Sequence, residues 1–176
     1  MSNPVLFWGG IYSQWYRSPF EVDGVDYRTA EHFMMAGKAR CFDDEAALEK
    51  ILAERDPAKV KAIGRTIKGW DDDVWKRFRF QIVARGSYEK FLQNEDLREQ
   101  LIETGDREIV EASPYDKIWG VGLGEDEARR WYEDAANSNH NFVCEGGIRH
   151  EVQVSWPGLN LLGKALMAAR TLLTPQ

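Results

Sequence analysis

The sequence predicts an α+β domain that is predominantly helical and carries two or three small β-hairpins. Two observations predict this class. Apolar residues recur at helical spacing through most segments, as do Val60, Ile63 and Ile67. Short apolar segments also flank the dipeptides Asp23-Gly24 and Gly146-Gly147, and glycine accepts the positive φ of a tight hairpin turn. No internal repeat or long linker divides the 176 residues, so we expect a single domain over 1–176.

Capping signals place the elements of the first half. Thr29 is a suitable N-cap for the helix that follows it, and Asp56-Pro57 is a strong helix start because proline suits the first turn. The expected elements are a strand at 5–8, a hairpin at 20–27, and helices at 30–40, at 44–53 and from residue 57 onward.

Acidic residues and glycines place the elements of the second half. Asp71-Asp72-Asp73 opens the longest helix, because carboxylates complement the positive end of the helix dipole. We expect its core face to hold Val74, Phe78, Ile82 and Phe91. After it we expect a helix at 95–103, a strand at 108–112, a helix at 125–136, a hairpin over 142–156 and a last helix at 160–172.

Composition excludes several classes of protein. An apolar share of 43% excludes a disordered chain. A net charge of −6 argues against a surface coated in basic charge for bulk nucleic-acid binding, although it permits a small basic pocket. We see no signal peptide and no apolar run long enough to span a membrane, so we expect a cytoplasmic protein. Cys41 and Cys144 form no metal-type pair, and we expect free thiols and no metal site.

Glu31 is the first candidate for chemistry. Phosphate loops, nucleophile elbows and dinucleotide fingerprints are absent from the sequence, which leaves carboxylates and aromatics. Glu31 lies in the first turn of a helix, where a glutamate can simply favour the helix dipole or can act as acid or base beside a pocket. The neighbouring His32 is more typical of a packed histidine. Lys38 and Arg40 end the helix, where they suit the dipole and could also hold a phosphate.

Two further segments combine charges or glycines with tryptophan. Arg65, Lys68 and Trp70 lie beside glycines and are either solvated charge or phosphate anchors beside a base-stacking ring. Asp116 and Trp119 lie in a glycine-containing loop, and such loops often carry function. The alternatives are a core position for Trp119 and, at the last helix, a capping role for Asn160.

Several of these segments occur in an order that resembles a known family. They are Tyr12-Ser13-Gln14-Trp15, Thr29-Ala30-Glu31-His32-Phe33, Gly64-Arg65, Lys68-Gly69-Trp70, Asp116-Lys117-Ile118-Trp119-Gly120 and Asn160-Leu161-Leu162-Gly163. Together they resemble the NADAR (YbiA-like) family of N-glycosidases over nearly the whole chain. The first segment departs from the commoner Phe-Ser-Asn-Phe pattern, and the resemblance is weakest over about 124–155, which we expect to be a family-variable insertion.

The resemblance implies a helical α+β fold and an N-glycosidase without a cofactor. The implied reaction is hydrolysis of the bond between ribose, in ADP-ribose or ribose 5-phosphate, and a guanine-like base. Glu31 matches the family's catalytic glutamate, and Asp116 could protonate the leaving base. The candidate substrate-binding residues are Tyr12, Trp15, Lys38, Arg40, Arg65, Lys68, Trp70, Trp119, Gly120 and Asn160. The implied partners are an ADP-ribosylated guanine nucleoside or single-stranded nucleic acid, and an ADP-ribosyltransferase toxin.

Two alternatives stay open at this point. One branch of the family acts on the ribosylamino-pyrimidine phosphates of early riboflavin synthesis. A non-catalytic module that binds ADP-ribose or NAD would use the same stacking and phosphate contacts. The substrate that the protein cleaves separates the two enzymatic hypotheses, and binding without any cleavage indicates the non-catalytic module.

Overall fold

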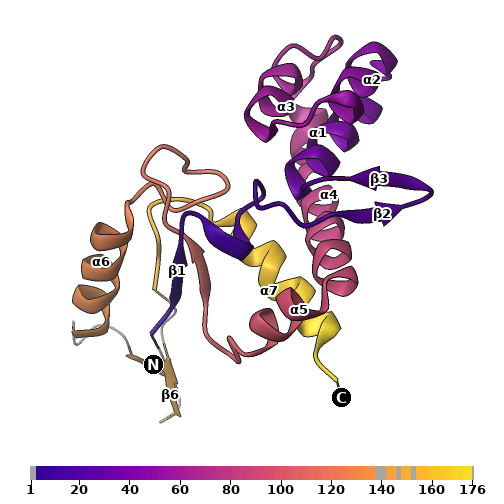
Figure 1. The fold of residues 1–176 in the computed structure, drawn as a ribbon. Coiled ribbons are helices and arrows are strands. Elements are labelled where there is room, and N and C mark those ends of the chain that lie inside the picture. Colours follow the sequence, from indigo (N-terminus) through magenta and orange to yellow (C-terminus); the bar gives the residue numbers. More distant parts are fainter. Residues whose placement is uncertain (1–2, 138–141, 146–147, 152–153, 176) are drawn as a thin grey trace. The chain divides into compact units, whose positions relative to one another are not determined.

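The protein is mostly helical, as its sequence predicts. A computed structural model describes residues 3–137, 142–145, 148–151 and 154–175 (Figure 1). Its helices are α1 (Ala30–Cys41), α2 (Glu45–Ala53), α3 (Pro57–Gly64), α4 (Asp72–Gln93), α5 (Glu95–Ile102), α6 (Glu125–Asn137) and α7 (Leu161–Leu173). A short 3-10 turn, η1 (Gly10–Tyr12), was not predicted. None of the helices in the described part of the chain combines the length and apolarity needed to cross a membrane.

The described strands form three pairs. They are β1 (Val5–Phe7), β2 (Phe20–Val22), β3 (Val25–Tyr27), β4 (Ile109–Glu111), β5 (Phe142–Glu145) and β6 (Ile148–Glu151). The predicted hairpins are confirmed as the antiparallel pairs β2–β3 and β5–β6, although Gly146-Gly147 itself lies outside the described residues. The second hairpin is shorter than predicted, because β6 ends at Glu151 and residues 154–156 form no strand. The remaining pair is parallel, with Val5 opposite Ile109. Both strands were predicted, but their partnership was not.

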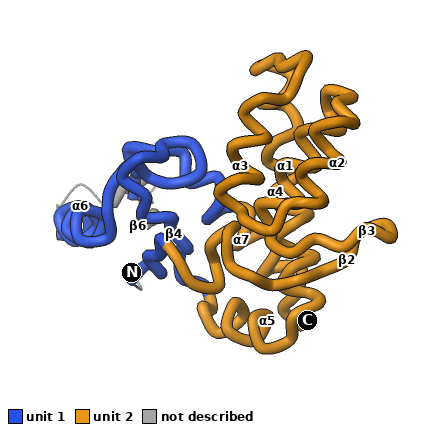
Figure 2. The backbone as a smooth tube through the Cα atoms, turned by 45° about the horizontal axis from the view of Figure 1, so that its top comes forward, with its two compact units in different colours: residues 1–8, 106–164 blue, residues 9–105, 165–176 orange. Residues whose placement is uncertain are grey.

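The chain divides into two compact units, each assembled from two separate segments (Figure 2). Unit 1 contains Met1–Trp8 and Asp106–Lys164, and unit 2 contains Gly9–Gly105 and Ala165–Gln176. The single domain and the insertion at 124–155 stay predictions, and parts of that segment lie outside the described residues.

Unit 2 is built around α1, which packs against α2, α3 and α4. Helix α1 begins where the sequence predicts, because the Thr29 hydroxyl accepts a hydrogen bond from the His32 backbone N–H. The β2–β3 hairpin packs on this helix through aromatic rings. The ring centroids of Phe20 and Tyr27 lie 5.9 and 4.9 Å from that of Phe33. Burial of these three rings fixes the first turn of α1, the turn that carries Glu31.

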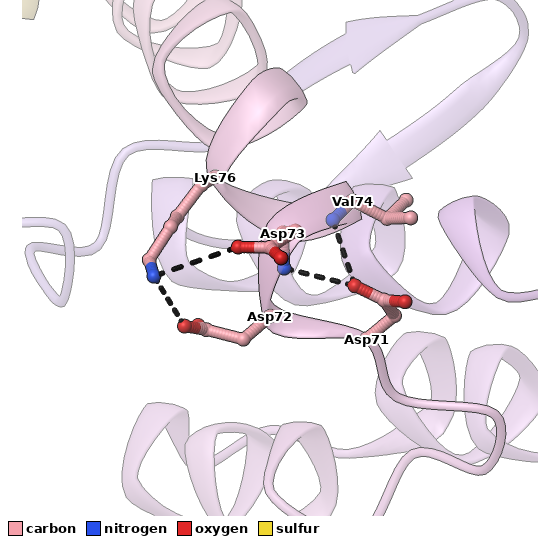
Figure 3. A network of polar contacts seen from close by, with 5 residues as sticks. All are labelled: Asp71, Asp72, Asp73, Val74 and Lys76. Carbon is pink, nitrogen blue, oxygen red and sulfur yellow. Dashed lines mark hydrogen bonds and ion pairs between the residues drawn. The ribbon is translucent and has the colours of Figure 1, made fainter.

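Carboxylates start helix α4 as the sequence predicts (Figure 3). The Asp71 side chain accepts hydrogen bonds from the backbone N–H groups of Asp73 and Val74 at 2.9 and 3.0 Å. One turn on, the Lys76 ammonium lies 2.6 Å from the Asp72 carboxylate and 3.8 Å from that of Asp73. The cap satisfies backbone donors that would otherwise lack partners at this helix start.

The predicted core face of α4 is wrong at Phe78, whose side chain is 46% exposed. The buried face instead includes Trp75, Val83, Gly86 and Lys90. Gly86 lies on this face, and a Cβ atom there would lie 2.7 Å from the Phe33 ring of α1. The packing of α1 against α4 at this point therefore needs a residue without a side chain, which hydrophobic periodicity does not predict.

In unit 1, helix α6 packs against strand β1, which pairs with β4. Its core consists of buried Val110, Ala112, Val121 and Ala128, with half-buried Trp156 packed against them. The Trp156 indole N–H donates a 3.0 Å hydrogen bond to the Glu108 carboxylate. This small core supports the loop that carries Asp116 and Trp119.

Candidate functional site

Glu31 is buried at the start of α1, with only 4% of its surface exposed. Its backbone N–H donates a 2.9 Å hydrogen bond to the carbonyl of Gln14, which ties the segment before Trp15 to the helix start. A glutamate is rarely buried unless other groups stabilise its charge. The helix dipole provides part of that stabilisation, and Lys38 on the same helix interacts favourably with the carboxylate.

Lys38 extends this site along α1. Its ammonium donates a 2.6 Å hydrogen bond to the Gly64 carbonyl and lies 3.9 Å from the ring centroid of Trp70. Burial lowers the pKa of Lys38, and repulsion by Arg65 lowers it further, while attraction to Glu31 opposes both. We call these residues, Glu31, Lys38, Arg65 and Trp70, the Glu31 site. It combines a buried carboxylate, two cations and an aromatic ring, which are the groups that a phosphorylated nucleoside needs.

The remaining predicted residues of unit 2 lie in different surroundings. Tyr12 is half-buried, stacks on Phe91 and donates its hydroxyl to the Gln100 carbonyl. Trp15 is 44% exposed, with the Lys61 ammonium 5.8 Å from its ring centroid. Tyr12 therefore has structural partners, whereas Trp15 presents a ring to solvent.

Arg40 and Lys68 do not share the surroundings of Lys38. Arg40 lines a cavity of about 590 Å³ beside the β2–β3 hairpin, with its guanidinium 6.0 Å from the Tyr27 ring. The backbone N–H of Lys68 donates to the Asp44 carboxylate at 2.8 Å. Arg40 follows Lys38 by two residues, which corresponds to a rotation of about 200° around the helix axis. The two side chains therefore lie on different faces of α1.

His32 has the packing role that the sequence favours. Its Nδ1 lies 2.8 Å from the Thr29 hydroxyl and its Nε2 lies 3.1 Å from the Glu54 carbonyl oxygen. A carbonyl only accepts, so Nε2 carries the proton and Nδ1 accepts from the hydroxyl. Burial lowers the pKa of His32, which keeps the ring neutral.

The other predicted residues, Asp116, Trp119, Gly120 and Asn160, belong to unit 1. The Asp116 carboxylate accepts backbone hydrogen bonds from Ile118 and Trp119 at 2.7 and 2.8 Å, so it shapes the loop. A Cβ atom on Gly120 would lie 2.7 Å from the Glu111 carbonyl oxygen. The glycine is therefore required by close backbone packing.

Asn160 joins the start of α7 to strand β4. Its side-chain oxygen accepts from the Glu111 N–H at 3.1 Å, and its amide donates to the Ile109 carbonyl at 2.9 Å. The residue is 1% exposed. The adjacent Gly163 also serves this junction, because a Cβ atom there would overlap the Ile109 carbonyl oxygen. These contacts indicate that the segment from Asn160 to Gly163 packs the start of α7 against β4.

We expect Asn160→Ala to lower the free energy of unfolding by roughly 2–5 kcal/mol, because it leaves two buried backbone groups without partners. Urea unfolding measures this change, with Asn137→Ala, an exposed asparagine of the same unit, as the control. Unchanged stability combined with weakened substrate binding would instead assign Asn160 to the substrate pocket.

Two ionisable groups, the buried Lys90 and the half-buried Glu108, were missed in the sequence. The Lys90 side chain is 2% exposed, and its ammonium donates to the carbonyls of Ile11 and Ser13 at 2.6 and 3.0 Å. It thereby holds the segment that carries Tyr12 and Trp15. Burial raises the pKa of Glu108, while its hydrogen bond from Trp156 lowers it. A lysine on the apolar face of a long helix was the available signal for Lys90.

The described residues contain no cluster of three histidine, cysteine, aspartate or glutamate side chains that could hold a metal ion. Cys41 is a free thiol, as expected, and burial raises its pKa. The side chain of Cys144 lies outside the described residues.

Comparison with known proteins supports a single family. Residues 6–174 match the NADAR domain. An N-glycosidase of Acanthamoeba polyphaga mimivirus is 39% identical over 165 residues, covering 91% of this chain and 85% of the relative. A riboflavin biosynthesis protein of Vibrio vulnificus is 33% identical over 127 residues, covering 69% of this chain but only 34% of that protein.

The fold also has a solved counterpart. The NMR structure of the E. coli protein YbiA matches with a TM-score of 0.70 and 24% identity, covering 98% of this chain and 87% of YbiA. This likeness supports the predominantly helical α+β fold, and the domain match covers all the residues of the Glu31 site. The chain belongs to the NADAR family.

Proposed function

We propose that this N-glycosidase removes ADP-ribose from a modified guanine by hydrolysing the bond between the ribose and the base. The enzyme class, a hydrolase acting on N-glycosyl bonds, follows from a relative named N-glycosidase that aligns over most of the chain. The observation that carries the proposal is the burial of the Glu31 carboxylate, 4% exposed, beside the cation of Lys38. A buried carboxylate in this setting can act on a developing positive charge with little screening by water.

The proposed chemistry assigns a step to Glu31. As the bond between the anomeric carbon and the base nitrogen breaks, positive charge develops on the ribose ring. Glu31 stabilises that charge and takes a proton from water, whose oxygen bonds to the anomeric carbon. The leaving nitrogen gains a proton from solvent, and the role of Asp116 as a proton donor stays a prediction, because its carboxylate already accepts two backbone hydrogen bonds. Lys38 and Arg65 hold phosphate oxygens, and Trp70 stacks on the base.

A second candidate substrate is a ribosylamino-pyrimidine phosphate. The observation in its favour is the similarity to the riboflavin biosynthesis protein, although this chain spans about a third of that protein. We favour the guanine substrate because two cations and an exposed indole suit a diphosphate and a large base. The N-glycosidase relatives also favour an enzyme over a non-catalytic ADP-ribose or NAD reader. The toxin partner and the cytoplasmic location stay predictions.

A direct comparison of substrates tests the proposal. The purified protein is incubated with ADP-ribosylated guanosine and, separately, with a ribosylamino-pyrimidine phosphate, and the products are separated by chromatography. We expect free ADP-ribose and an unmodified guanine product from the first substrate. Turnover of the pyrimidine compound alone would overturn the guanine assignment.

Trp70→Ala should raise KM roughly 5- to 100-fold with little change in kcat, because one stacked base is lost. The indole is 43% exposed, so its removal should not prevent folding. Trp131→Ala is the matched control, since Trp131 has the same exposure but belongs to α6. Steady-state kinetics on the active substrate measures both variants. A lower melting temperature with unchanged KM would assign Trp70 a packing role only.

A further inference from the structure

A cavity of about 590 Å³ lies between the β2–β3 hairpin and the helices α1 and α4, all within unit 2. Figure 1 shows the hairpin extending from the side of these helices. Most of the cavity wall consists of aliphatic and aromatic side chains, among them Val22, Val25, Tyr27, Phe33, Phe78 and Ile82. We call this space the hairpin cavity. Its volume and its apolar wall are typical of sites that bind small molecules.

The hairpin cavity and the Glu31 site use different faces of α1. Gly37 and Cys41 line the cavity and follow Phe33 by four and eight residues, so these three share one face of the helix. Lys38 follows Glu31 by seven residues, which places those two on another face. At about 100° of rotation per residue, the two faces point roughly 110° apart. The cavity is therefore separate from the Glu31 site.

Polar contacts hold the hairpin in place against α4. The Gln93 side chain exchanges two hydrogen bonds with the backbone of Glu21, at 2.8 and 2.9 Å. At the hairpin turn, the Arg85 guanidinium lies 3.0 Å from the Asp23 carboxylate. These contacts join the hairpin to α4 on both sides of Val22, which lines the cavity. The outer wall is therefore formed before any ligand binds, as in most small-molecule sites.

The wall that α4 contributes is apolar but poorly covered. Phe78 is 46% exposed and Ile82 is half-buried, although the helical periodicity predicts both for the core. Gly37 of α1 brings the two helices together behind this wall, since a Cβ atom there would lie 2.7 Å from the Ile82 side chain. A ligand that displaces water from this apolar surface gains binding free energy from the hydrophobic effect.

Arg40 gives the cavity a positive charge. Its exposed side chain lines the cavity, with the guanidinium 6.0 Å from the ring centroid of Tyr27. Among the residues that the structure describes, the guanidinium has no hydrogen-bond or ion-pair partner. The other charged lining residues, Arg85 and Asp23, pair with each other. The lining therefore offers one uncompensated cation beside aromatic rings, which suits one anionic group on an aromatic ring.

We propose that the hairpin cavity binds a small aromatic molecule that carries one anionic group. The ring of the ligand packs against Phe78 and the aliphatic wall, and its carboxylate, sulfonate or phosphate accepts hydrogen bonds from Arg40. This site is independent of the proposed N-glycosidase substrate, because it uses another face of α1.

Two fluorescent dyes that differ in one group test the inference. The first is anilinonaphthalene sulfonate, and the second is N-phenylnaphthylamine, which has the same ring system without the sulfonate. Each dye is titrated into the folded protein, and its fluorescence measures binding. We expect one dye molecule to bind per chain, and the sulfonate dye to bind more tightly than the neutral one.

Variants of the cavity wall separate the charge from the apolar contact. Arg40→Ala should weaken binding of the sulfonate dye roughly 3- to 30-fold and leave binding of the neutral dye unchanged. Phe78→Ala should weaken binding of both dyes about 2- to 10-fold. The matched controls are Arg77→Ala and Phe80→Ala, which remove exposed side chains of α4 that do not line the cavity.

Alkylation of Cys41 locates the bound dye. This half-buried thiol lines the cavity, and mass spectrometry of peptides distinguishes it from Cys144. Because burial raises the pKa of Cys41, the reaction with iodoacetamide is run at alkaline pH. We expect the sulfonate dye to slow alkylation of Cys41. Excess ADP-ribose should change neither the binding of the dye nor this protection.

Four results would overturn the inference. They are the absence of dye binding to the wild-type protein, equal losses in the cavity variants and their controls, unprotected Cys41 in the presence of bound dye, and displacement of the dye by ADP-ribose. A dimer in sedimentation that Phe78→Ala dissociates would assign this surface to a second copy of the chain and would also overturn it. Failure of the protein to cleave any substrate would refute the proposed function but would not alter the result with the dyes.

Discussion

Glu31→Gln is expected to lower the rate of N-glycosidic cleavage by roughly 10²–10⁴-fold while the protein stays folded. The amide keeps the size of the side chain but can neither take a proton from water nor offset positive charge on the ribose. The buried position of Glu31 beside Lys38 makes that charge effective. Single-turnover measurement of product release, with circular dichroism of the variant, gives both quantities.

The competing explanation is that Glu31 only stabilises the helix through its dipole. Glu45 provides a matched control, because it also lies in the first turn of a helix, α2, but is exposed. Glu45→Gln should leave the cleavage rate unchanged. Near-normal turnover by folded Glu31→Gln, with only a lower melting temperature, would remove Glu31 from the mechanism.

Lys90→Met is expected to abolish a strong dependence of stability on pH. Burial lowers the pKa of Lys90 from 10.5 to about 7. Between these values the unfolded chain binds a proton that the folded protein has released, so the free energy of unfolding of the wild-type protein rises with pH. The slope from this one group reaches about 1.4 kcal/mol per pH unit. The methionine variant lacks the group and should show a flatter profile.

The comparison between wild type and variant gives the clearest measurement. From pH 7 to pH 9 the stability of the wild-type protein relative to Lys90→Met should increase by about 2–3 kcal/mol in urea unfolding. Lys76→Met is the control, since Lys76 lies on the same helix but is half-exposed and pairs with Asp72. Parallel pH profiles for wild type and Lys90→Met would contradict the burial of an amine at this position.

Lys90 also links the stability of the protein to the position of Trp15, a candidate substrate-binding residue. Its hydrogen bonds to Ile11 and Ser13 hold the chain just before Trp15. Methionine can fill the space but cannot donate, so both carbonyls lose their partner. An increase in KM for Lys90→Met beyond that for Lys76→Met would show that this segment must be held in place for substrate binding.

Local signals were sufficient for most of the fold. Thr29 and Asp56-Pro57 mark the starts of α1 and α3 because capping depends on neighbouring residues alone. Asp23-Gly24 marks the β2–β3 hairpin for the same reason, and both residues adopt a positive φ. Interactions between distant segments were not predictable in this way. The parallel pairing of β1 with β4 and the close packing of Gly86 on Phe33 depend on how whole elements meet.

The candidate site was predicted in part, for related reasons. Glu31, Lys38 and Trp70 were identified because motif order and helical spacing are visible in the sequence. Lys90 holds the segment that carries Tyr12 and Trp15 from a distant helix, and only folding brings the two together. Asn160 and Gly120 were predicted to bind substrate, yet each has a packing role that explains its residue type. A motif alone does not distinguish these two reasons for a residue.

The β1–β4 pair has a consequence for synthesis on the ribosome. Strand β1 is made first, but its partner β4 is made only after the whole unit 2 segment Gly9–Gly105 has been translated. The edge of β1 therefore stays without its partner during most of elongation, and such long-range pairing forms slowly. A nascent chain stalled before Ile109 should consequently expose this apolar strand to chaperones.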